Sequence, residues 1–435
     1  MAQEIYHRSD WGYASNEWGR VYVNAELSNE LYKRAANYEN SWDSDKTLDA
    51  INKKASIVLL PTAYSEDVIH NVKPSSAPFG DMTFVQDGSP TRVNENELVE
   101  TVATDIPRID YSQGEGAILV ELQGTNQVRY SEDFSNALWQ KVGVTLTSST
   151  GINPRGESAT IYAIQGDAAQ GGLEAAMVSS ATGNGVGVSC WVRKKSGVGT
   201  TNVQIGYGDT SSGAGHTVSV GADWQRITYT STGYTGANRF YIDAEGTSSD
   251  NIIEIWGAQI EKTGGGQDGF VTSYIPTVST SSTRLADSYL DGGDVSLINS
   301  VSGVLFVERQ CFDTDTNEWI LLTATGEDET VSVGIYGNSS GGNSTRVKTS
   351  TDTEYKGFGG SKTDMLKLAV KWDGTEIKTF RGGSLIQTGT LSGGFTSNQL
   401  TELHLSTGQV FNGRLKQLVL FKEALTDAEI IALTS

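Results

Sequence analysis

Aromatic side chains on otherwise polar strand faces are the residues of this sequence best suited to chemistry. An exposed ring can stack on the apolar face of a sugar, and neighbouring amides or acids can bind the sugar hydroxyl groups. The candidate rings lie in two regions of the chain, with Trp191, Tyr207 and Tyr241 in the first and Tyr336 and Tyr355 in the second. These five residues are the predicted carbohydrate-binding side chains.

Trp191 shows how the residue pattern argues for an exposed ring. In the run VSCWVRKK one strand face is apolar, and it is made by Val188, Cys190 and Val192. Because successive side chains of a strand point to opposite faces, Trp191 is expected on the other face. The alternative is that this ring packs on a neighbouring subunit or module. The second region is rich in Gly and Ser, and the alternative there is ordinary turn chemistry.

Three acidic residues are candidate calcium ligands: Glu132, Asp133 and Glu261. Calcium is bound by oxygen atoms that converge from several loops. Glu132 and Asp133 precede the expected first strand of a sandwich and Glu261 follows its last strand, so the three carboxylates can meet at one seam. The alternative is that they are solvated surface groups. Calcium is the single cofactor that the sequence suggests.

No arrangement of residues points to catalysis. Glycoside hydrolysis needs two carboxylates about 5–10 Å apart, and among 52 acidic residues nothing in their order singles out a pair. The sequence has no nucleophile-elbow G-x-S-x-G motif. The four histidines are scattered without metal-ligand spacing, at His7, His70, His216 and His404. We therefore predict that the protein is not an enzyme.

Composition and charge exclude several classes of protein. The chain carries 32 basic and 52 acidic residues, a formal net charge of −20 that repels nucleic-acid phosphates. No apolar stretch approaches the roughly 18 residues of a membrane helix, and the start of the chain lacks the pattern of a signal peptide. We expect synthesis in a bacterial cytoplasm and release by a route such as cell lysis. Cys190 and Cys311 lie in apolar runs and are expected to be buried free thiols.

The elements that position these residues are mostly short strands, because 50 glycines but only 7 prolines accompany many Ser, Thr and Asn residues. Four regions are predicted: a partly helical segment at 1–56, a small β adaptor at 57–128, a jelly-roll sandwich at 129–280 and a second sandwich at 281–435. In the first, apolar residues recur at helical spacing. This helix either packs on its own domain or anchors the chain to a larger assembly.

Local patterns predict individual elements. The run NIIEIWGAQIEK predicts a strand with a buried Trp256, on a face shared by Ile252, Trp256, Ala258 and Ile260. DMLKLAVKW predicts another strand with Trp372 toward the core, and the Asp-Gly pair after it predicts a hairpin turn. SIVLLPTAY predicts a strand that ends at Pro61. Thr426 and Glu429 are spaced as a capping box, which predicts a closing helix.

Three stretches resemble structural proteins of bacteriophages. The segment from Thr91 to Lys141 is similar to a module of phage tail and virion proteins, with TRVN, PRIDY and YSEDF in the order of that family. Here Glu97 replaces the usual Gly, and LQG at 122–124 replaces a Pro-containing segment. WGAQIEK and the residues after it resemble the closing strand of a carbohydrate-binding-module-like jelly roll. LAVKWDGTEIKTFRGG and FNGRLKQLVLFKEALTDAEI are similar to laminin-G-like and concanavalin A-like sandwiches.

This resemblance covers the chain from Thr91 onward and implies a mainly β protein of tandem β-sandwiches. It also implies a location on the virion exterior, as a tail fibre, spike or head fibre that attaches to a host cell-surface glycan. The resemblance also implies a structural calcium ion at the seam, because similar jelly rolls bind calcium there. The implied partners are other virion proteins, bound through 1–56, and further copies of the chain.

We expect a homotrimer, because cyclic repetition gives a thin fibre stiffness and avidity. We expect no nucleic-acid binding and no membrane insertion. Two other functions remain open. One is a purely structural head fibre or capsid decoration subunit without a ligand, and the other is a polysaccharide depolymerase.

Overall fold

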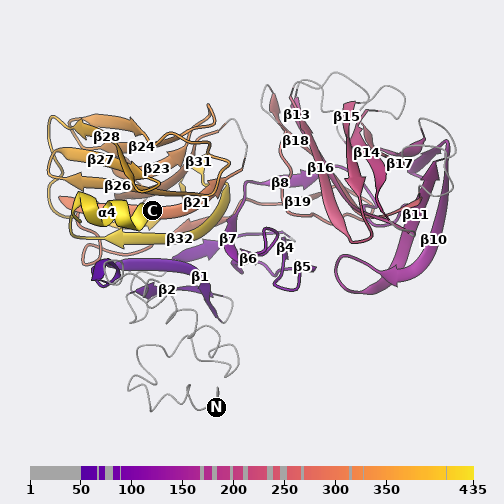
Figure 1. Cartoon of the computed structure of the whole chain (residues 1–435), viewed down its shortest axis with the longest axis horizontal. Helices are drawn as coiled ribbons and strands as arrows, with labels where there is room; N and C mark the ends of the chain where they lie inside the picture. Colours follow the sequence, from indigo (N-terminus) through magenta and orange to yellow (C-terminus); the bar gives the residue numbers. More distant parts are fainter. Residues whose placement is uncertain are drawn as a thin grey trace, which may run out of the picture. The chain divides into compact units, whose positions relative to one another are not determined.

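The computed structural model describes residues 50–65, 68–73, 82–88, 90–166, 171–178, 184–195, 199–208, 214–232, 239–244, 252–265, 269–312, 316–326, 328–407 and 409–435. Most of the predicted anchor at 1–56 therefore lies outside the described residues. At its end, residues 50–52 are helical and Ile51 is buried. The described chain is mainly β and forms tandem β-sandwiches, as predicted (Figure 1).

The described residues divide into two compact units. Unit 1 contains the residues up to Gln86 together with Asp105–Leu122 and Ala286–Ser435, and unit 2 contains Asp87–Thr104 and Gln123–Leu285. The predicted adaptor at 57–128 is thus divided between them rather than standing alone as a third body. The reason lies in long-range pairing, since its strands complete sheets whose other strands are distant in sequence.

Unit 2 is a sandwich of two antiparallel sheets, each with five strands among the described residues. Their strand orders are β10-β11-β18-β13-β16 and β15-β14-β17-β12-β9. Two further pairs, β4–β5 and β8–β19, belong to the same unit. The strands are β4 (Thr91–Val93), β5 (Val99–Thr101), β8 (Gly124–Asn126), β9 (Trp139–Val142), β10 (Val144–Ile152), β11 (Ser158–Gly166), β12 (Gly172–Ala176), β13 (Asn184–Lys194), β14 (Thr201–Tyr207), β15 (Ala214–Val220), β16 (Gln225–Ser231), β17 (Arg239–Ala244), β18 (Ile252–Gly265) and β19 (Ser282–Arg284).

Unit 1 is built on a larger pair of sheets. One runs β2-β1-β32-β21-β26-β27-β28, with β7 beside β32 and β6 beside β7; the other runs β25-β24-β23-β22-β31-β30, with β29 beside β22. A separate pair joins β3 to β20. The bounds are β1 (Ile57–Ser65), β2 (Val68–Lys73), β3 (Thr83–Val85), β6 (Arg108–Asp110), β7 (Ala117–Val120), β20 (Ser288–Leu290), β21 (Ser302–Cys311), β22 (Glu318–Ala324), β23 (Asp328–Gly337), β24 (Asn343–Lys348), β25 (Thr353–Gly357), β26 (Leu366–Asp373), β27 (Glu376–Arg381), β28 (Ser384–Thr390), β29 (Glu402–His404), β30 (Ser406–Thr407), β31 (Gln409–Val410) and β32 (Gly413–Phe421).

Strand β26 confirms the predicted alternation. Its apolar side packs in the main core of unit 1, while Ala369, on the opposite side, belongs to a second cluster beneath the C-terminal helix. Gly374 has φ +60° in the turn that leads to β27, so the Asp-Gly hairpin is confirmed as well. Strand β1 differs from prediction because it continues beyond Pro61 to Ser65. The pairing of β1 with β2 is irregular between Leu59 and Tyr64, which accommodates the missing N–H.

Helix α4 (Asp427–Thr434) begins with the predicted capping box. The Thr426 hydroxyl accepts a hydrogen bond from the Glu429 N–H, and the Glu429 carboxylate accepts one from the Thr426 N–H. Ile430 and Leu433 bury the inner face of the helix in the second cluster of unit 1. The capping box therefore fixes where a buried element begins.

Replacing Thr426 with alanine should lower the free energy of unfolding of unit 1 by about 1 kcal/mol, because the first turn loses its cap. Burial alone would raise the pKa of Glu429, but hydrogen bonds from Lys54 and Thr426 hold this pKa below its usual value. The stabilisation that the charged Glu429 contributes is therefore complete at pH values above the ordinary carboxyl pKa. It is lost as the pH falls through the lowered pKa of Glu429. Urea unfolding at neutral pH measures the change. Thr426→Ser should behave like the parent chain, and equal loss in both variants would contradict the assignment.

Strand β18 carries the main departure from the predicted alternation. Ile253 and Ile255 face the core of unit 2, and so do Ala258 and Ile260. The alternation of side chains shifts by one residue between these two pairs because the strand has a β-bulge there. Gly257 has φ +66° and the pairing with β13 is irregular at this point. Trp256 is buried, as predicted, but the bulge turns it away from the main core and into a small aromatic cluster. The single face predicted for Ile252, Trp256, Ala258 and Ile260 is wrong.

Both cysteines are free and buried, as predicted. Burial raises the pKa of each thiol to about 12, so neither is a ready nucleophile. Among the described residues, no helix combines the length and the apolar character needed to cross a membrane.

Candidate functional site

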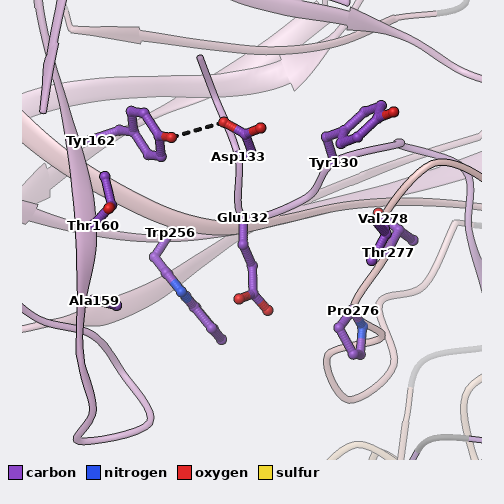
Figure 2. A pocket seen from close by; sticks show the side chains of 10 residues that line it. All are labelled: Tyr130, Glu132, Asp133, Ala159, Thr160, Tyr162, Trp256, Pro276, Thr277 and Val278. Atoms are coloured by element: carbon purple, nitrogen blue, oxygen red, sulfur yellow. Dashed lines mark hydrogen bonds between the residues drawn. The ribbon is translucent and has the colours of Figure 1, made fainter. Parts of the chain in front are cut away.

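A pocket of about 590 Å³ opens in unit 2 (Figure 2). Segment 130–133 forms one wall, strand β11 forms a second, and segment 276–278 forms a third, with Trp256 of β18 between them. Its volume falls within the range of about 300–1,000 Å³ that is usual for small-molecule sites. The lining residues are Tyr130, Glu132, Asp133, Ala159, Thr160, Tyr162, Trp256, Pro276, Thr277 and Val278.

Ser131 joins two walls of the pocket, although its own side chain is buried beneath them. Its hydroxyl accepts a hydrogen bond from the Thr277 N–H at 2.9 Å and lies 2.7 Å from the Tyr274 hydroxyl. The Ser131 carbonyl accepts a bond from the Ala258 N–H at 2.9 Å. A short hydroxyl side chain suits this position because it satisfies backbone and side-chain groups at once. These bonds fix segments that are far apart in sequence.

Tyr130 adopts a strained backbone conformation at the pocket wall. Its φ is +55°, a region that bulky residues rarely enter. The backbone is held there at both ends, because the Tyr130 N–H donates to the Val278 carbonyl at 2.6 Å and the Tyr130 carbonyl accepts from the Trp139 indole at 3.0 Å. Strain of this kind concentrates at functional sites.

Asp133 and Tyr162 form one side of the pocket, where the Tyr162 hydroxyl donates to Asp133 at 2.8 Å (Figure 2). Asp133 also accepts from the N–H and the hydroxyl of Ser135, and these bonds lower the pKa of Asp133. Burial raises the pKa of Tyr162. The pair therefore offers a fixed ring and a carboxylate that stays charged at neutral pH.

Glu132 is the second acid of the pocket, and its side chain is 37% exposed. Burial raises the pKa of Glu132, and this effect is opposed by Arg155, whose guanidinium lies 3.7 Å away, and by the Tyr274 hydroxyl, which donates at 3.0 Å. Figure 2 shows the carboxyl groups of Glu132 and Asp133 pointing in different directions. The pocket thus presents two acids in unlike environments.

Trp256 is 2% exposed and belongs to an aromatic cluster behind the pocket. Its ring centre lies 4.9 Å from that of Tyr274 and 5.4 Å from that of Trp191. The Arg155 guanidinium stacks over it at 5.4 Å. The ring is therefore rigid, because it is held by packing on several sides.

The structure corrects the exposure expected for the three predicted sugar-binding rings of unit 2. Trp191 lies off the main core, as its strand alternation predicts, but it is only 7% exposed because Trp256, Tyr274 and the stacked Arg226 cover it. Tyr207 packs in the main core and donates to the Ser231 hydroxyl at 2.6 Å. Tyr241 is buried over the backbone of two glycines in neighbouring strands. None of the three offers an open ring.

The two predicted rings of unit 1 differ from each other. Tyr336 of β23 is half-buried and stacks on Trp319, with ring centres 3.8 Å apart. Tyr355 of β25 is 56% exposed, so it keeps the accessibility that the sequence predicts. Both lie outside the pocket of unit 2.

The predicted calcium ligands are not brought together. Glu132 and Asp133 line the pocket, but Glu261 is buried and accepts hydrogen bonds from Gln259 and from Thr272. Burial raises the pKa of Glu261, which favours its neutral form. In the part of the chain that the structure describes, no three His, Cys, Asp or Glu side chains are grouped to hold a metal ion.

Tyr130 and Tyr162 are pocket residues that the sequence did not single out. The signal was present in YSEDF, where Tyr130 lies two residues before Glu132, the first of the two candidate acids. The position of Tyr162 follows only from the pairing of β11 with β18, which places that strand beside Trp256. Sequence spacing alone does not contain that information.

Comparison with known proteins gives partial structural likenesses. No protein-family model matches the chain, and no curated protein matches it in sequence. The carbohydrate-binding module CBM40 of the Ruminococcus gnavus IT-sialidase, bound to α2,3-sialyllactose, is similar over 31% of this chain and 83% of that one, with 16% identity and a TM-score of 0.27. A SAP-like pentraxin from Limulus polyphemus is similar over 32% and 71%, with 14% identity and a TM-score of 0.28. A leech intramolecular trans-sialidase is similar over 31% and 23%, with 16% identity and a TM-score of 0.26. Likenesses this partial carry no argument about ligand or activity.

Proposed function

We propose that the chain is a virion surface protein of a bacteriophage that attaches to a host glycan through the pocket of unit 2. The observation that carries the glycan part is the combination of Tyr130 and Tyr162 with two carboxylates in one preformed pocket. Rings provide a face for sugar C–H groups, and carboxylates accept bonds from sugar hydroxyls. The virion part is supported by the sequence resemblance from Thr91 onward.

Rigidity of the pocket favours binding. Ser131 and the bonds of Tyr130 hold two walls before any ligand arrives, so little side-chain and loop freedom is lost when a sugar enters. Val278, at the third wall, is 74% exposed, which leaves an apolar surface available to a ligand. A preformed site with exposed apolar groups and a few fixed polar groups is what a small ligand requires.

The proposal is a binding role without catalysis. Asp133 accepts three hydrogen bonds from Ser135 and Tyr162, which hold it as a charged acceptor. Glu132 points in another direction (Figure 2). Glycosidases instead place two carboxyl groups on either side of one scissile bond.

The remaining parts of the proposal concern assembly. We propose that residues 1–56 attach the chain to other virion proteins and that the chain acts as a homotrimer on the virion exterior. Their support is the change from helical to sandwich-type sequence after residue 56, together with the gain in avidity from a multivalent fibre. Nucleic acid and membrane are not proposed as partners, because the net charge is −20 and no long apolar stretch occurs in the sequence.

Replacing Tyr162 with alanine should weaken binding to host-cell glycans by about tenfold, because a stacked ring and the anchor of Asp133 are lost together. Tyr130→Ala should have a similar effect. Binding is measured by adsorption of purified protein to host cells and on a glycan array, with thermal melting recorded for each variant.

Tyr355→Ala is the matched control, since it removes an exposed tyrosine from unit 1. Loss of adsorption in the Tyr355 variant, with normal adsorption of the pocket variants, would place the glycan site in unit 1 instead. Tyr162→Phe keeps the ring and should retain most of the affinity. A lower melting temperature in Tyr162→Ala that matches the loss of adsorption would show that folding, not binding, was affected.

A purely structural subunit is the alternative that the structure favours next. Trp191, Tyr207 and Tyr241, the rings expected on the surface of unit 2, are used in packing. A head fibre or capsid decoration subunit would have no need of open rings. That function would be supported if the glycan array gave no binding and the pocket variants assembled and adsorbed normally.

A further inference from the structure

The pocket of unit 2 is acidic. Among the residues that the structure describes, its lining includes the two carboxylates of Glu132 and Asp133 and no basic side chain. A third acid, Glu157, acts electrostatically on Glu132. The guanidinium of Arg155, 3.7 Å from Glu132, opposes these negative charges.

Arg155 is already occupied behind the pocket. It donates to the Thr101 hydroxyl at 2.9 Å, lies 3.7 Å from Glu132 and stacks over Trp256. It does not line the pocket. An anionic sugar entering here would meet carboxylates without gaining a cationic partner, and this costs affinity because like charges repel.

The aromatic residues that line the pocket favour a cationic ligand, as its negative charge does. Tyr130 and Tyr162 supply rings whose negative faces attract cations, whereas the Trp256 ring already carries the Arg155 guanidinium. Rings combined with carboxylates are the surroundings that best suit an ammonium group. The third wall contributes Pro276 and the exposed Val278, which suit the apolar part of the same ligand.

We propose that this pocket selects a sugar with a free, protonated amino group over its N-acetylated form, and that it rejects sugars bearing a carboxylate. The ammonium group would bind at Glu132, whose carboxyl group points toward the side of Pro276 (Figure 2), and the apolar part of the sugar would lie against Pro276 and Val278. This inference rests on the proposed glycan-binding function and names the class of sugar.

The test compares three short probes by calorimetry on the full chain: a glucosamine trisaccharide with free amines, the same trisaccharide fully N-acetylated, and sialyllactose. We expect the free-amine probe to bind about tenfold more tightly than the acetylated one, as expected for a hydrogen bond to a charged group, and sialyllactose to bind least. Glu132→Gln should reduce this preference to within about threefold, because its amide keeps the shape of the side chain but not its charge.

Asp223→Asn is the matched control, because it removes an exposed acid of unit 2 outside the pocket. It separates local recognition from general attraction of a cationic probe to an acidic protein. Equal or tighter binding of sialyllactose, or an unchanged preference in Glu132→Gln, would overturn the inference while leaving glycan binding intact. Failure of all three probes to bind, together with normal host adsorption of the Tyr162 variant, would overturn both the inference and the proposed function.

Discussion

Replacing Arg108 with alanine should destabilise unit 1 by about 3–5 kcal/mol, because it leaves buried negative charges without their cation. The Arg108 guanidinium is fully buried; it donates to Glu121 at 2.6 Å and to Asp287. Neither carboxylate has appreciable access to water. Asp287 also accepts a bond from the Glu121 N–H at 2.8 Å, so one ion cluster ties β6, the end of β7 and the segment before β20.

Urea unfolding of the full chain would measure this loss in the transition of unit 1. The matched control is Lys416→Ala, which breaks the ion pair with the exposed Glu115 in the same unit and should cost less than about 1 kcal/mol. A volume-matched apolar replacement of all three residues should recover much of the stability. If Arg108→Ala and Lys416→Ala had equal effects, the cluster would not be the structural junction described above.

Replacing Trp191 or Trp256 with alanine should cost about 3–5 kcal/mol each, because either change opens a cavity in the aromatic cluster of unit 2. Both rings are buried, contact each other and also contact Tyr274. Since Trp256 and Tyr274 also support the pocket, these variants should bind glycan weakly even when folded. Thermal melting and glycan binding are to be measured on the same samples.

Trp224→Ala is the control for these two substitutions. This indole is only partly buried at the edge of the same cluster, under the stacked Arg193, and its removal should cost clearly less. A Trp191→Ala protein that melts like the parent chain would show that the ring is a surface residue after all. The sugar-binding role predicted for Trp191 from its strand alternation would then regain its physical basis.

Local patterns predicted the elements of this fold well. The alternation in β26, the Asp-Gly turn after it and the capping box at Thr426 depend on residues close together in sequence, and all three are confirmed. The β18 prediction failed at one point because Gly257 inserts a bulge, and one extra residue reverses the face of every side chain before it.

The candidate site was harder to predict for the same physical reason. Its walls come from segments around residues 132, 160 and 277, which are joined by Ser131 and by strand pairing rather than by any local pattern. Exposure of a ring likewise depends on what covers the outer face of a sheet. Trp191 is covered by residues of other segments, and the sequence of its own strand does not predict where those residues lie.

The division of the chain between the two units has a consequence for its synthesis on the ribosome. All strands of the two sheets of unit 2 lie between residues 139 and 265, so both sheets can close while the C-terminal third is still untranslated. Unit 1 cannot, because β1 pairs with β32, and the Ser56 hydroxyl donates to the carbonyl of Leu420, 364 residues later. The edge of β1 opposite β2 must therefore stay unpaired through most of elongation, and an unpaired strand edge exposes a nascent chain to association with other chains.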